Sequence, residues 1–147
     1  MPSQKKKENN ITTELYNIET KTFSPIFIST VKDIFKIVRP QGNYKNSISV
    51  LSYIKKNSDI KTKSGLIIGL GETFEQIQAT MRDLHNAGCD ILTIGQYIQP
   101  SKNHFEVAKY YTLEEYDTLK QMAKDAGFKI YQIGPLVRSS YNASNLI

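Results

Sequence analysis

The 147-residue sequence is poor in the side chains that form disulfides and metal centres. Its single cysteine, Cys89, excludes an internal disulfide and any metal site made only of this chain's cysteines. The two histidines, His85 and His104, are too far apart in sequence to form the pair that a zinc-binding helix carries. These shortages are typical of a reducing compartment, and they argue against a self-contained metalloenzyme.

Long apolar runs are also absent. The apolar run at residues 64–70 is far shorter than the ~20 residues needed to cross a bilayer, which excludes a transmembrane protein. Hydrophobic residues make up 39% and charged residues 22%, a balance typical of one soluble domain. Residues 1–16 contain no apolar segment for a secretory signal and, with Glu8 and no arginine, no transit-peptide character. We expect residues 1–16 to be a disordered, lysine-rich tail without a targeting segment.

Positive charge is concentrated in the first part of the chain. Residues 1–63 contain 12 lysines and arginines against 5 acidic residues, whereas residues 64–147 contain 7 against 9. The basic part suits either an acidic partner or a solvated surface. Nucleic acid is disfavoured, because the lysines are scattered and no arginine–aromatic alternation marks a stacking platform.

Hydrophobic periodicity predicts alternating helices and strands from Tyr44 onward. The spacing predicts a helix over 44–56 and helices that begin after Thr73 and Thr112, where each threonine starts a capping box. Short apolar runs predict buried strands at 62–70, 90–96 and 129–133. The apolar face of the last helix is expected to be Leu113, Tyr116, Leu119, Ala123 and Ala126. The α-β-α-β-α-β order predicts an α/β fold with neighbouring parallel strands and the helices on one face.

Two predicted strand ends carry polar or glycine-rich residues. Gly65, Gly69 and Glu72 lead from one strand into a helix, and Gln96 and Gln99 follow the next strand. The carboxyl edge of a parallel sheet is where ligands bind, and glycines let a backbone approach a ligand closely. A glycine turn and solvated amides explain the same residues without a ligand. The spacing alone leaves both interpretations open.

Longer strings resemble a known family. TKSGLIIGLGET at 62–73, GCDILTIGQYIQPSKNH at 88–104 and GPLVRSSYNA at 134–143, with VRP at 38–40, are similar to the C-terminal half of lipoyl synthase. The similarity runs over about residues 17–143 in nearly unbroken register. The glycines and glutamate of the first string also fit the Gly-x-Ile-x-Gly-x-x-Glu pattern of radical S-adenosylmethionine enzymes.

This resemblance implies a fold, cofactors and substrates. The fold would be the C-terminal part of a partial (βα)6 TIM-like barrel, with S-adenosylmethionine as radical source and two [4Fe-4S] clusters. The reaction would insert two sulfur atoms into an octanoyl chain on a carrier protein: a 2-oxoacid dehydrogenase E2 subunit or the glycine cleavage H protein. Neither nucleic acid nor a membrane is an expected partner. The implied cofactor-binding residues are Asn17, Glu19, Ser64, Gly65, Gly69, Glu72 and Gln96, and the implied metal ligand is Ser140.

The sequence also departs from this family. Both three-cysteine motifs are missing, so the cluster ligands are absent, and we expect a truncated chain that is inactive alone. The family's His-Asn-x-Glu-Thr begins here with Tyr16, and residues 21–30 look like an insert. The alternatives are a non-catalytic remnant, a partner-binding fragment and the product of a mispredicted gene. The family implies a mitochondrial or plastid location in eukaryotes and a cytoplasmic one otherwise.

Overall fold

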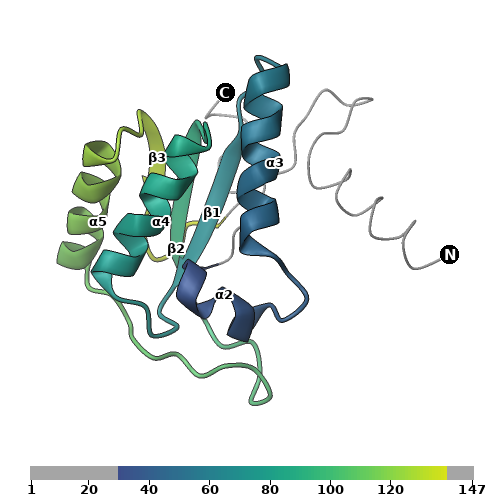
Figure 1. The fold of residues 1–147 in the computed structure, drawn as a ribbon. Coiled ribbons are helices and arrows are strands. Elements are labelled where there is room, and N and C mark those ends of the chain that lie inside the picture. Colours follow the sequence, from purple (N-terminus) through teal and green to yellow (C-terminus); the bar gives the residue numbers. More distant parts are fainter. Residues whose placement is uncertain (1–29, 139–147) are drawn as a thin grey trace, which may run out of the picture.

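A computed structural model describes residues 30–138, which form an α/β fold (Figure 1). The predicted tail at 1–16 and nearly all of the predicted insert at 21–30 lie outside these residues. The elements are α2 (Lys32–Val38), α3 (Tyr44–Asn57), β1 (Lys63–Ile68), α4 (Phe74–Asn86), β2 (Ile91–Gln96), α5 (Leu113–Asp125) and β3 (Ile130–Ile133). None of these helices is long and apolar enough to span a membrane.

The three strands form one parallel sheet in the order β1-β2-β3. Lys63 pairs with Ile91, which pairs in turn with Ile130, so the strands start at nearly the same level. Figure 1 shows α3, α4 and α5 together in front of the sheet. The predicted parallel strands and single helical layer are therefore confirmed. Within residues 30–138 the sheet is open, so the six-stranded barrel stays a prediction.

Local sequence signals set the ends of the longer helices. Thr73 and Thr112 each accept a hydrogen bond from the third helical N–H, and the side chain at that position bonds back to the cap. Gly88 and Gly127, with φ of 89° and 104°, follow α4 and α5, in a conformation that glycine adopts without strain. Both predicted capping boxes are confirmed.

The helical layer and one face of the sheet share the hydrophobic core. Side chains alternate along a strand, and Leu66, Ile68, Leu92 and Ile94 belong to the helix-side cluster. The predicted place of Leu113 in this core is wrong, because its side chain is 73% exposed. Leu113 is the first residue of α5 and lies beyond the packed turns of that helix.

The short helix α2 has no counterpart among the predicted elements. It is seven residues long, and no side chain caps its first turn. Its anchor is Phe35, 1% exposed, whose ring packs edge-on against Tyr44 with ring centres 5.8 Å apart. A contact between separate segments therefore fixes α2. Val31, Ile34, Phe35 and Val38 have helical spacing, but a seven-residue helix without a side-chain cap is too short for this pattern alone to predict it.

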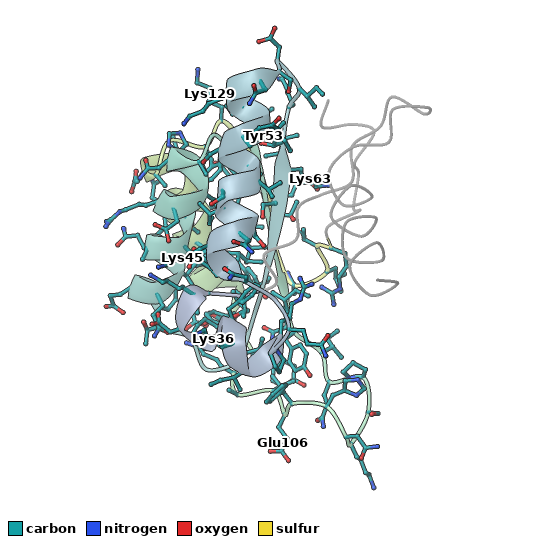
Figure 2. All side chains as sticks on the ribbon, turned by 45° about the vertical axis from the view of Figure 1, so that its right-hand side comes forward. Lys36, Lys45, Tyr53, Lys63, Glu106 and Lys129 are labelled. Atoms are coloured by element: carbon teal, nitrogen blue, oxygen red, sulfur yellow. The ribbon has the colours of Figure 1, made fainter. Side chains whose placement is uncertain are left out.

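A buried lysine stands at the start of β1, on the face of the sheet opposite the helices (Figure 2). Lys63 is 3% exposed, and Figure 2 shows its side chain on the side of β1 away from α3. Its ammonium has no hydrogen-bond partner among residues 30–138. Burial lowers the pKa of this ammonium, because desolvation penalises the charged form.

We expect Lys63→Met to stabilise the chain by ~1 kcal/mol at pH 7, because methionine keeps the volume and removes a buried charge. Urea unfolding of the full chain measures this difference. The matched control is Lys61→Met, since Lys61 is exposed two residues earlier and its replacement should change little. A loss of stability in Lys63→Met would contradict the prediction and indicate a carboxylate partner outside the described residues.

Candidate functional site

The carboxyl ends of β1 and β2 lie side by side. Ile68 pairs with Gln96, and the Tyr97 N–H donates to the Ile68 carbonyl at 2.7 Å. The turn after β1 and the loop after β2 therefore leave the sheet together. This is the edge at which the sequence predicted a ligand site, and Gly69, Glu72 and Gln96 meet there.

A buried carboxylate closes the turn between β1 and α4. Glu72, 7% exposed, folds back so that its Oε1 accepts from the Gly69 N–H at 2.5 Å and its Oε2 from the Leu70 N–H at 3.0 Å. The Tyr111 hydroxyl donates to the same Oε1 at 2.8 Å. Gly69 has a φ of 109°, which glycine adopts readily. The motif glutamate therefore holds its own turn and ties it to a distant residue.

The Gln96 amide makes four hydrogen bonds inside the chain. Its Nε2 donates to the carbonyls of Lys109, at 2.9 Å, and Tyr97, at 3.1 Å. Its Oε1 accepts from the Tyr111 N–H at 3.1 Å and the Tyr116 hydroxyl at 3.3 Å. With 4% of its surface exposed, Gln96 is a clamp between β2, the following loop and α5. A direct contact of this amide with a cofactor stays a prediction.

Hydrogen bonds hold the loop over 97–112 to the end of β1 and to the glycine turn. Figure 2 shows Glu106 on this loop, beyond the carboxyl edge of the sheet. The Ala108 N–H donates to the Gly69 carbonyl at 2.8 Å, which joins the loop to the glycine turn. The Lys109 ammonium pairs with Glu115 and lies 4.7 Å from the centre of the Tyr111 ring. Lys109 and Tyr111 are site residues that the sequence analysis missed, because their partners are distant in sequence.

Two other predicted cofactor-binding residues lie toward the opposite end of β1. Ser64 and Gly65 are buried near the start of β1, and Ser64 is about 13 Å along the strand from Ile68 at ~3.3 Å per residue. The Ser64 carbonyl accepts a long, 3.5 Å bond from the Thr93 hydroxyl. Asn17 and Glu19 lie outside the described residues, as does the predicted metal ligand Ser140.

The described residues do not form an iron–sulfur site. Residues 30–138 contain no group of three histidine, cysteine or acidic side chains that could hold a metal ion. Cys89 is 4% exposed, and its thiol donates to the Ile91 carbonyl at 3.2 Å. Burial raises the pKa of this thiol to about 12, which disfavours the thiolate that a cluster requires. Cys89 is therefore a small buried residue of the hydrophobic core.

Comparison with known proteins gives a consistent relationship. No protein-family model matches the chain. The chain is 45% identical over 119 residues to the lipoyl synthase of Chlorobium phaeobacteroides, a match covering 81% of this chain and 42% of that protein. It is 47% identical over 116 residues to the lipoyl synthase of Chlorobaculum parvum, a match that covers 79% of this chain and 40% of that protein. It is 49% identical over 117 residues to the lipoyl synthase of Rubrobacter xylanophilus, a match that covers 79% of this chain and 36% of that protein. The chain is therefore similar to lipoyl synthases over about four fifths of its own length, and it spans about two fifths of the length of these relatives.

Proposed function

We propose that this chain provides part of a lipoyl synthase, an enzyme that inserts two sulfur atoms into a protein-bound octanoyl chain by radical chemistry. The observation that carries the proposal is 45% to 49% identity to lipoyl synthases over four fifths of the chain. The ordered edge formed by Gly69, Glu72 and Gln96 supports it, because ligands of parallel α/β sheets bind at that edge. The remaining strands of a (βα)6 barrel would come from outside residues 30–138.

The proposed cofactor at this edge is S-adenosylmethionine, which supplies a 5′-deoxyadenosyl radical when bound. The side chain of Glu72 bonds the turn after β1, and the side chain of Gln96 bonds the loop after β2. Their proposed role is to hold the backbone of Gly69 in one conformation, so that the edge is rigid before the ligand arrives. Such a frame fits a ligand recognised mainly through backbone groups and shape.

The two [4Fe-4S] clusters of the family do not fit the residues described here. One buried cysteine cannot supply the thiolates of either cluster. The proposed substrates are octanoylated carrier proteins, namely E2 subunits of 2-oxoacid dehydrogenases and the glycine cleavage H protein. A non-catalytic remnant that binds a partner is the alternative that the experiment must exclude.

A chimera tests the proposal. The segment of Chlorobaculum parvum lipoyl synthase that matches this chain would be replaced by the corresponding residues of this chain, leaving the relative's cysteine motifs intact. We expect the chimera to restore lipoyl formation in bacteria that lack lipoyl synthase, whereas the 147-residue chain alone restores none. A chimera that folds and binds iron yet forms no lipoyl product would favour the remnant.

A further inference from the structure

The chain after β3 crosses the face of the sheet opposite the helices. The Gly134 N–H donates to the Ile94 carbonyl at 3.0 Å, which continues the β2–β3 ladder by one bond. Gly95 follows Ile94, whose side chain faces the helices, so a side chain at Gly95 would point to the other face. Val137 lies against that position, which places the segment 134–138 over the carboxyl end of β2.

Gly95 leaves the space that this segment occupies. A Cβ on Gly95 would lie 1.9 Å from the Val137 carbonyl oxygen, 3.0 Å from its carbonyl carbon and 2.9 Å from Nη1 of Arg138. The nearest atoms belong to backbone, so the segment would have to move to admit even a methyl group. Gly95 lies inside a regular strand, where glycine is unfavourable unless another backbone approaches closely.

Arg138 bonds back to the carbonyls of the segment that lies against Gly95. Its Nη1 donates to the Val137 carbonyl at 2.8 Å and, with a longer bond of 3.5 Å, to the Pro135 carbonyl. Burial raises the pKa of Tyr116 to about 12, and the positive charge of Arg138 opposes this rise. The charge of Arg138 therefore acts on Tyr116, whose hydroxyl donates to the Gln96 amide.

We infer that Gly95 is a positioning residue, which holds Val137 and Arg138 against the sheet and so fixes the point at which the chain leaves the carboxyl edge. The expected effect on lipoyl formation rests on the proposed function, whereas the seating of Val137 rests on the distances at Gly95. The arrangement places the Arg138 guanidinium beside Gly95, at the carboxyl edge of the sheet.

Hydrogen exchange in the full 147-residue chain tests the seating directly. In Gly95→Ala we expect at least tenfold faster exchange of the amides at residues 134 and 137, while the Cys89 amide, bonded to Leu84 in the helical layer, stays protected. Gly134→Ala is the matched control, because its Cβ would meet only Val137 Cγ2 at an ordinary 3.6 Å. Unchanged exchange in Gly95→Ala, or equal loss of protection at all three amides, would overturn the inference.

A second variant avoids any new clash. Arg138→Ala removes the two hydrogen bonds to the segment without changing Gly95, and it should speed exchange at residue 137 about threefold. No change there would count against the inference. In the chimera, Gly95→Ala should lower the ratio of lipoyl product to 5′-deoxyadenosine at least tenfold, and an unchanged ratio would refute the positioning role. Failure of the proposed function is distinguishable, because the unmodified chimera would then form no lipoyl product while the exchange result stands.

Discussion

Replacing Gly69 by alanine should destabilise the chain by about 3 kcal/mol, one of the largest effects expected of a single methyl group here. Gly69 has a φ of 109°, a conformation that costs other residues ~1–2 kcal/mol. Its Cβ would also lie 2.4 Å from Gln96 Nε2 and 2.7 Å from the Lys109 carbonyl oxygen. Relieving these contacts must break the clamp between β2 and the loop, and overpacking of this kind costs ~1–3 kcal/mol.

Gly71→Ala is the control that separates conformational strain from crowding. Gly71 has nearly the same φ, 107°, but the nearest atom to its Cβ would be Ala108 Cβ at 3.9 Å. We expect this variant to lose only ~1 kcal/mol, the cost of the conformation alone. Urea unfolding of both variants gives the comparison. Equal losses in the two variants would contradict the crowded environment of Gly69.

Features of the fold that depend on local sequence could be predicted. Thr73 and Thr112 mark the starts of their helices, because a capping box involves only the threonine and the residue three positions later. The strands follow from short apolar runs, and each begins within one residue of its predicted start. Leu113 shows the limit of periodicity, since it falls on the apolar face of α5 but is the first residue of that helix and is exposed.

Features of the site that depend on long-range contacts could not be predicted from the sequence. The sequence placed Gly69, Glu72 and Gln96 at one edge, because the carboxyl ends of adjacent parallel strands meet. It gave no indication that Glu72 bonds Tyr111, which is 39 residues away. It also left open whether the Gln96 amide is solvated or binds a ligand, and it did not predict the bond to Lys109, which depends on how the intervening loop folds back.

The Glu72–Tyr111 hydrogen bond is expected to be the strongest single link between the glycine turn and the rest of the edge. Glu72→Gln should cost about 2 kcal/mol, because an amide cannot accept from Gly69, Leu70 and Tyr111 as a carboxylate does. Tyr111→Phe removes the hydroxyl donor alone. A double-mutant cycle by urea unfolding should give a coupling of ~1–2 kcal/mol between the two side chains.

The same bond predicts a pH effect. Burial, and then the hydrogen bond to Glu72, raises the pKa of Tyr111 above its ordinary value. A group whose pKa is raised by folding stabilises the fold below its unfolded pKa, ~10 for tyrosine, and this stability is lost as the pH rises further. Tyr111→Phe should therefore weaken the alkaline loss of stability above pH ~10. Its neighbour Tyr110, 69% exposed, provides the control, because Tyr110→Phe should leave the alkaline limb unchanged. Additive single-variant effects, or an unchanged alkaline limb in Tyr111→Phe, would show that the carboxylate and the hydroxyl do not stabilise each other.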